Sequence, residues 1–176
     1  MLEGLVQVYT GDGKGKTTAA IGQGFRSVGR GLKVYMIQFL KNSDTGELHS
    51  CEKLGEAFKI FRFEKKRGFF WTLNEKEKEE LKNEVYKAFE FAKEVLENEK
   101  CDVLILDEIM GVLGNKIIKE QDVCDLIKNK PRHIELILTG RNAPQSIIDL
   151  ANYVSEIVAI KHPIEQGIGA RKGIEY

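Results

Sequence analysis

A glycine-punctuated stretch that ends in Gly15, Lys16 and Thr17 is the part of the sequence best suited to bind phosphate. Gly11, Gly13 and Gly15 are spaced two residues apart, between an apolar run and the Ala-rich start of a helical pattern. Such glycines let the backbone adopt positive φ and turn N–H groups toward an anion, and the following helix adds the positive end of its dipole. We therefore predict a triphosphate-binding loop in which Lys16 reaches the phosphates and the Thr17 hydroxyl contacts Mg²⁺.

The loop departs from the strict P-loop pattern at one position. Thr10 stands where that pattern has glycine, five residues before Gly15. A glycine-rich turn without any ligand is the alternative, but the strand, the loop, the Gly-Lys-Thr triplet and the helix start coincide here, which favours nucleotide binding. The same loop serves kinases, motors, switches and group-transfer enzymes, so it leaves the chemistry open.

Two carboxylates, Asp107 and Glu108, follow a second apolar run. In an open parallel sheet, ligands bind at the carboxyl edge of the strands, so both side chains can converge on a metal ion held by Thr17. Carboxylate oxygens are the hard ligands that Mg²⁺ prefers, directly or through water. Acidic residues that only favour the start of a helix are the alternative. With the phosphate-binding loop present, the metal site is the favoured interpretation.

An aromatic segment, residues 67–72, precedes the longest helical pattern. It runs from Arg67 through Gly68, Phe69 and Phe70 to Trp71, the only tryptophan of the chain, and ends one residue later. It could close the following helix as a hydrophobic staple. It could instead be a mobile flap that presents a flat apolar surface to a large planar ligand. The residues themselves leave both interpretations open.

The turn Thr139, Gly140 and Arg141 follows another apolar run and is expected at the same edge. Arg141 could face a phosphate, or it could form only a salt bridge. Both roles stay open at this point.

These residues need a sheet that brings several strand ends together. Apolar runs rich in β-forming residues recur along the chain, mostly separated by helical patterns, and several are nearly continuous in hydrophobicity, as strands covered on both faces are. We predict an α/β fold: a doubly wound, mostly parallel six-stranded sheet of the RecA-like P-loop type, in a single domain over residues 1–176. The predicted strands are Leu5–Tyr9, Val34–Leu40, Phe58–Phe63, Val103–Leu106, Ile134–Leu138 and Val154–Ile160.

Two helices should position the candidate residues. One follows the phosphate-binding loop from Thr17 to about Val28. The other begins near Asn74, which can form a capping box with Glu77. Apolar residues of the second helix recur at helical spacing and predict a buried stripe. The stripe consists of Leu81, Val85, Ala88, Phe89, Ala92, Val95 and Leu96.

Composition narrows the partners and the location. The 27 basic and 27 acidic residues cancel, so no global field favours nucleic acid, and we predict no nucleic-acid partner. Cys51, Cys101 and Cys124 are odd in number and far apart, which indicates reduced thiols. The first residues form no basic and apolar leader, and no apolar run approaches bilayer length, so we predict a cytoplasmic protein with no membrane partner.

Taken together, these segments resemble the ATP:corrinoid adenosyltransferases of the P-loop type, in which cob(I)alamin is adenosylated. The resemblance is carried by TGDGKGKTT at 10–18, GFFW at 68–71, LDE at 106–108, TGR at 139–141 and the tail from Lys161 and His162 to Ile174. The segments occur in the family's order over nearly the whole chain. Thr10 in place of glycine agrees with the family pattern.

The resemblance implies attack by Co(I) of a reduced corrinoid on C5′ of ATP, with intact triphosphate as the leaving group. Lys16 and Mg²⁺, or Mn²⁺, would then stabilise the charge that accumulates on the departing triphosphate. Phe69 and Trp71 match aromatic residues that the family places against the lower face of the corrin. There they displace the axial base and make Co(II) easier to reduce. The family also binds ATP with its phosphates reversed along the loop.

The site implied by the resemblance has three parts. Phe69, Trp71 and Lys16 would act in catalysis, and Thr17 and Glu108 would hold the metal, with Asp107 close behind. The nucleotide would be held by Gly11, Asp12, Gly13, Lys14, Gly15, Lys16, Thr17, Thr18 and Arg26.

The resemblance also implies partners. We expect a homodimer that uses ATP and a corrinoid, with an electron donor such as a reduced flavin or flavoprotein. Many relatives cover the corrin with an N-terminal extension from a partner subunit. Only a few residues precede Leu5 here, so we expect looser corrin binding or covering by another segment. A kinase or RecA-like ATPase, which would release diphosphate, and a binding module without turnover are the alternatives.

Overall fold

The computed structural model describes residues 3–68 and 70–176. Six strands form one sheet in the order β3-β2-β4-β5-β1-β6, and every neighbouring pair is parallel. The predicted α/β class and six-stranded sheet are confirmed, and the described sheet is wholly parallel. The strands are β1 (Val6–Thr10), β2 (Val34–Gln38), β3 (Phe58–Phe61), β4 (Val103–Asp107), β5 (Glu135–Thr139) and β6 (Tyr153–Glu156).

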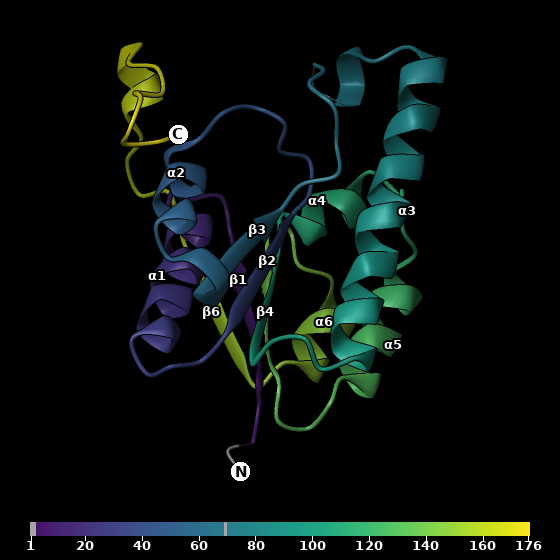
Figure 1. Ribbon diagram of the computed structural model, residues 1–176. Helices are drawn as coiled ribbons and strands as arrows, with labels where there is room; N and C mark the ends of the chain where they lie inside the picture. The colour runs from purple at the N-terminus through teal and green to yellow at the C-terminus, as the bar shows by residue number, and fades with distance from the viewer. Residues whose placement is uncertain (1–2, 69) are drawn as a thin grey trace.

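Helices cover both faces of the sheet, so it is doubly wound (Figure 1). One face carries α1 (Lys16–Val28) and α2 (Gly46–Glu52). The other face carries α3 (Glu75–Glu97), α4 (Ile109–Gly114), α5 (Glu120–Asn129) and α6 (Gln145–Leu150). Short 3₁₀ turns are η1 (Gly55–Ala57), η2 (Phe70–Thr72) and η3 (Pro163–Gln166).

The core explains why the central strands are apolar without alternation. In β4, Leu104 and Leu106 pack into the layer under α3 to α6, whereas Val103 and Ile105 pack into the layer under α1 and α2. All four side chains are buried. A strand with helices on both faces has no solvent side, so it requires apolar residues at successive positions.

The long helix α3 begins as the sequence predicts. The side chain of Asn74 accepts from the Glu77 N–H, and the side chain of Glu77 accepts from the Asn74 N–H, each at 2.9 Å. This capping box satisfies two backbone donors that the first turn leaves unpaired. All seven residues of the predicted apolar stripe are buried, so that prediction is confirmed as well.

Three strands are shorter than predicted at their carboxyl ends. β2 ends at Gln38, two residues before Leu40, whose left-handed φ of 54° cannot continue a strand. The edge strands β3 and β6 each pair with one neighbour only. The last residue pair between β1 and β6 is Thr10 with Glu156, and β1 ends at Thr10. The chain beyond Glu156 therefore has no neighbouring strand with which to pair.

The parallel arrangement places all strand ends at one edge of the sheet. The phosphate-binding loop and the turns that contain Glu108 and Arg141 lie there. Residues 62–68 and 70–74 project beyond this edge on one side of the molecule, and residues 161–176 project beyond it on the opposite side (Figure 1). Among the described residues, none of the helices combines the length and the apolar character needed to span a bilayer.

Candidate functional site

The loop between β1 and α1 uses its glycines in two different ways. Gly11 and Gly15 have φ of 98° and 122°, the left-handed region that glycine tolerates best. Gly13 lies outside this region, so the prediction of positive φ at that residue is wrong. A Cβ at Gly13 would lie 2.7 Å from the carbonyl oxygen of Ile157 and 2.8 Å from the backbone of Val158. Gly13 is therefore required for space, because the chain that leaves β6 runs directly against the loop.

One loop N–H does not point toward the centre of the loop. The Gly13 N–H donates to the carbonyl of Ile157 at 2.7 Å, and the Ile157 N–H donates to the carbonyl of Thr10 at 2.8 Å. The expectation that successive loop N–H groups all turn inward is thus wrong at Gly13. Backbone that follows β6 takes this donor and stabilises the loop from behind.

Lys16 bridges the loop from the first turn of α1. Its Nζ donates to the carbonyls of Gly11 at 2.6 Å and Gly13 at 2.8 Å. Burial lowers the pKa of Lys16, and the positive charge of Arg141 lowers it further. Arg141 also lies 3.7 Å from the carboxylate of Asp12, a largely exposed pair that contributes little stability. Two cations therefore face the loop in which a triphosphate is expected.

Thr17 and Asp107, expected to converge, lie within hydrogen-bond distance of each other. Thr17 Oγ1 at the start of α1 donates to Asp107 Oδ1 at the end of β4 at 2.8 Å. Asp107 is fully buried and accepts three further bonds. Thr139 Oγ1 donates to Oδ1 at 2.7 Å, while Gln38 Nε2 and Lys41 Nζ donate to Oδ2 at 3.1 Å and 2.7 Å. These bonds offset the cost of burying a charged group.

The oxygens of Thr17 and Asp107 already hold a cation, the ammonium of Lys41. Lys41 Nζ lies 2.7 Å from Asp107 Oδ2 and 3.1 Å from Thr17 Oγ1. We use the name cation pair for the two oxygens that contact this ammonium, Thr17 Oγ1 and Asp107 Oδ2. Hydroxyl and carboxylate oxygens are also the protein ligands that Mg²⁺ takes beside substrate phosphates. The residues present therefore fit a magnesium ion at this position.

Glu108 forms the turn between β4 and α4. It has φ of 64°, and its N–H donates to Thr139 Oγ1 at 2.9 Å, which connects the turn to the end of β5. Burial and the charge of Asp107 raise the pKa of Glu108, while Lys41 and Lys16 lower it. The carboxylate thus lies within the electrostatic field of the site, and Asp107 is the residue that contacts Thr17 directly.

Four other predicted nucleotide ligands lie at the surface. Asp12, Lys14 and Thr18 are exposed within or next to the loop. Arg26 is exposed in the last turn of α1, and the helical rise puts it about 15 Å along the axis from Lys16. The nucleotide-binding role of Arg26 stays a prediction.

The aromatic segment divides its side chains between the core and solvent. Phe70 packs against the core, and Leu73, the residue before the α3 cap, is buried, so these two residues close the start of the helix. Trp71 in η2 is 76% exposed. Phe69 lies outside the described residues. The staple interpretation thus suits Phe70, while Trp71 presents its ring at the surface.

Sequence reasoning missed two residues that contact Asp107. Gln38 ends β2 and Lys41 follows three residues later, and both reach the carboxylate because β2 is the neighbour of β4 with Gln38 opposite Asp107. The signal was available in part, since Lys41 comes directly after a predicted strand. Its use required knowledge of the strand order, which no local pattern contains.

Comparison with known proteins finds relatives over nearly the whole chain. A family model, ATP:corrinoid adenosyltransferase BtuR/CobO/CobP, matches residues 2–176. A corrinoid adenosyltransferase from Sinorhizobium sp is 36% identical over 99% of this chain and 81% of its own length. One from Escherichia coli K12 is 33% identical over 98% of this chain and 86% of its own length.

Among solved structures, a KaiC-like protein from Pyrococcus horikoshii aligns with a TM-score of 0.54 at 17% identity. The alignment covers 88% of this chain and 73% of that protein. This likeness concerns the fold alone and agrees with the predicted RecA-like P-loop architecture. The full-length match of the family model and the identities above lead to one conclusion: the chain belongs to the ATP:corrinoid adenosyltransferase BtuR/CobO/CobP family.

Proposed function

We propose that this enzyme transfers the 5′-deoxyadenosyl group of ATP to the cobalt of a reduced corrinoid and releases triphosphate. One observation carries the proposal within the family: a phosphate-binding loop with Lys16 and the cation pair lies at the same sheet edge beyond which Trp71 is exposed. A site for a triphosphate and a flat apolar group are thereby available on one side of the molecule.

The reaction is a nucleophilic substitution at carbon. The electron pair of Co(I) forms a bond to C5′, the C5′–O5′ bond breaks, and its electron pair leaves on the triphosphate. Cobalt gives up two electrons and becomes formally Co(III), so the step needs no proton transfer. The protein's task is then to position the two substrates and stabilise charge on the leaving group.

Lys16 and the cation pair suit that task. The Lys16 ammonium faces the loop, and the charge of Arg141 acts on the same position, so both can stabilise the negative charge that develops on the triphosphate. Thr17 and Asp107 would hold Mg²⁺ or Mn²⁺, which supplies further positive charge to the phosphates. Glu108 would contribute from the adjacent turn.

Trp71 is the described residue best placed to face the corrin. Its ring offers a large flat apolar surface, and Phe69 is proposed to act with it. Aromatic packing on the lower corrin face would exclude the axial base and make Co(II) easier to reduce. A reduced flavin or flavoprotein is the proposed electron donor.

We also propose that the enzyme is a homodimer. Support comes from apolar side chains that the single chain leaves exposed along and after β6, a surface of the kind that interfaces use. These residues are Tyr153, Val154, Val158 and Ile160.

The decisive test is anaerobic incubation of the enzyme with ATP, Mg²⁺ and chemically reduced cobalamin. The cob(I)alamin absorbance should disappear as adenosylcobalamin and inorganic triphosphate form in equal amounts. Diphosphate in place of triphosphate would identify a phosphoryl-transfer enzyme. Unchanged ATP with every corrinoid tried would indicate a binding module.

A further inference from the structure

We propose that Lys41 is a positioning residue that couples the cation pair to the aromatic segment. Its ammonium occupies the position that a divalent metal would take. Its neighbours Leu40 and Asn42 form hydrogen bonds to Glu64 and Arg67, which precede Trp71 in the chain. Metal-nucleotide binding would therefore reposition the aromatic segment before the corrinoid arrives. This inference rests on the proposed metal role of Thr17 and Asp107.

The first step is competition between two cations. Lys41 Nζ contacts both members of the cation pair, at 2.7 Å and 3.1 Å. A divalent metal bound to those oxygens at about 2.1 Å would lie almost against the ammonium, and the like charges repel. Lys41 and the metal therefore exclude each other, and binding of the metal displaces the lysine.

The displaced ammonium has a favourable destination. Lysine is a regular partner of phosphate, which it contacts as a point charge. A triphosphate in the loop places phosphate oxygens beside the metal, so Lys41 can exchange the Asp107 carboxylate for the nucleotide. The exchange needs both ligands, because the metal displaces the Lys41 ammonium from Asp107 and the phosphate then binds it.

The second step is transmission through the residues on either side of Lys41. The Leu40 N–H donates to Glu64 Oε1 at 2.7 Å, and Asn42 Nδ2 donates to the carbonyl of Arg67 at 3.1 Å. Both acceptors belong to residues 62–68, the stretch that leads from β3 into the aromatic segment. A shift of Lys41 therefore pulls on this stretch at two points.

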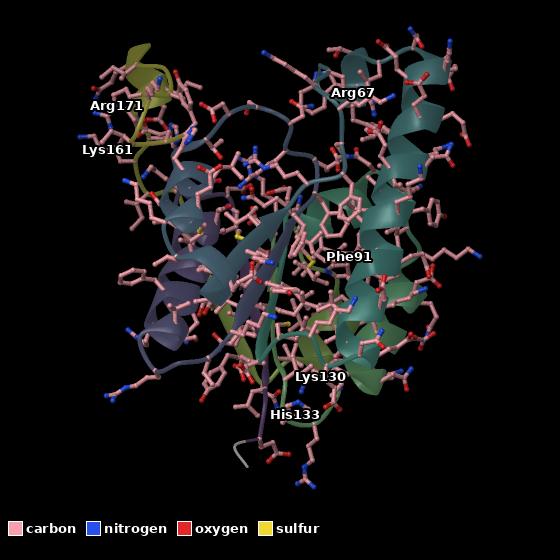
Figure 2. The ribbon with its side chains drawn as sticks, in the orientation of Figure 1. Arg67, Phe91, Lys130, His133, Lys161 and Arg171 are labelled. Carbon is pink, nitrogen blue, oxygen red and sulfur yellow. The ribbon has the colours of Figure 1, made fainter. Side chains whose placement is uncertain are left out.

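The third step is a pivot at Arg67. Its guanidinium makes two bonds to the Glu84 carboxylate of α3, at 2.7 Å and 3.1 Å, and lies 3.7 Å from Glu80. The side chains of Arg67 and Glu84 are only 8% and 12% exposed. Figure 2 shows Arg67 beside the first turns of α3. With its side chain held by α3 and its carbonyl held by Asn42, Arg67 transfers a backbone shift to the turn that contains Trp71.

Backbone strain marks the segment as one with a second arrangement. Leu40 adopts φ of 54°, a region that bulky residues rarely occupy and that persists only where surrounding contacts impose it. The bonds of Leu40 to Glu64 and of Lys41 to the cation pair are such contacts. Release of Lys41 removes one of them, which lets the backbone of Leu40 relax.

Trp71 makes the coupling measurable, since it is the only tryptophan of the chain. Tryptophan emission should be followed while the full-length enzyme is titrated with ATP and Mg²⁺ and without corrinoid. Binding should be measured in parallel by calorimetry, and Mn²⁺ binding without nucleotide by paramagnetic resonance. The variants are Lys41→Met and Asn42→Ala. Lys66→Met is the matched control, because it makes the same charge change at an exposed lysine next to the aromatic segment.

In the wild type and in Lys66→Met, emission should change with the same midpoint as nucleotide binding. ATP with chelator in place of metal should give a small response. Asn42→Ala should bind Mg²⁺ and ATP with an affinity within about threefold of wild type. Its emission change should be about fivefold smaller, because the hydrogen bond from Asn42 to the Arg67 carbonyl is lost. Lys41→Met should show a reduced change and bind Mn²⁺ alone about tenfold more tightly, because the competing cation is removed.

Two results would overturn the coupling. One is an emission change in Asn42→Ala and Lys41→Met equal to that of wild type. The other is nucleotide binding by the wild type with no emission change at all. Absence of Mg²⁺ and ATP binding in the calorimeter would instead refute the proposed function, and the inference with it. Circular dichroism of each variant identifies a loss of signal that comes from misfolding.

Discussion

One buried carboxylate organises the chemistry at the level of single residues. Asp107 accepts from Thr17, Thr139, Gln38 and Lys41, which come from four different elements or loops. A hydrogen bond to a charged group contributes about 1.5–3 kcal/mol. The protein thereby holds a position for positive charge at the foot of the phosphate-binding loop, and the loop residues need only bind the phosphates of the nucleotide.

Replacement of Trp71 tests the division between nucleotide and corrinoid binding. Because Trp71 is exposed in η2 and is not part of the phosphate-binding loop, Trp71→Ala should leave ATP affinity within about threefold of wild type. Adenosylation of cob(II)alamin under mild reductant should fall about 100-fold or more, since the aromatic packing that promotes reduction is lost. The measurement is adenosylcobalamin formation together with calorimetric ATP binding. Normal turnover would remove Trp71 from the mechanism.

Glu64 should make the stability of the protein depend on pH. Burial raises the pKa of Glu64 to about 7, assisted by the charge of Glu84 and opposed by the Leu40 N–H and Arg67. The folded protein then binds a proton that the unfolded chain releases near pH 4.5. The contribution is therefore present in full below pH 4.5 and is lost as the pH rises through 7, by about 3 kcal/mol.

Glu64→Gln should remove this dependence, because the amide can still accept from Leu40 but cannot ionise. Urea unfolding at pH 5 and pH 8 measures the effect. Relative to wild type, the unfolding free energy of the variant should be higher at pH 8 than at pH 5. Parallel pH profiles for the two proteins would show that Glu64 does not titrate in this range.

At the level of elements, the position of α1 depends on a close approach to the sheet. A Cβ at Gly24 would lie 2.7 Å from Cε1 of the buried Phe58 and 3.2 Å from Cγ1 of Val34. Gly24→Ala should therefore destabilise the protein by about 1–3 kcal/mol through overpacking. Urea unfolding provides the measurement.

Gly22 of the same helix supplies the control. It is exposed, and a Cβ there would meet no atom within 4 Å among the described residues. Gly22→Ala should stabilise the protein by up to about 1 kcal/mol, since alanine is the better helix former. Equal effects of the two substitutions would mean that α1 is not held against Phe58.

What the sequence could reveal about these elements depends on how local the signal is. The capping box at Asn74 and the stripe of α3 involve neighbours in the chain, so they were predictable. The contact between Lys41 and Asp107 depends on the pairing of β2 with β4, which a sequence pattern does not specify. The same limit explains Gly13, because its neighbour Ile157 comes from the other end of the chain.

At the level of the whole molecule, stability should decrease from the centre of the sheet to its β6 edge. β4 is buried and has neighbours on both sides, whereas every residue of β6 is exposed and pairs only with β1. In the single subunit, amides of Tyr153–Glu156 should therefore exchange at least about 100-fold faster than those of Val103–Asp107, and a dimer that covers β6 would reduce this difference. Hydrogen exchange followed by mass spectrometry can compare them. Equal rates would indicate that β6 opens only when the whole sheet unfolds.

The place of β1 in the sheet has a consequence for biosynthesis. β1 is made before the other five described strands, yet it pairs only with β5 and β6, the last two of them, and the glycine loop that follows β1 is stabilised by backbone beyond β6. The nascent chain must therefore carry an unpaired, largely apolar β1 until β5 and β6 have emerged. A translation product that stops before Ile157 lacks the backbone that supports the phosphate-binding loop, so nucleotide binding requires synthesis through this residue.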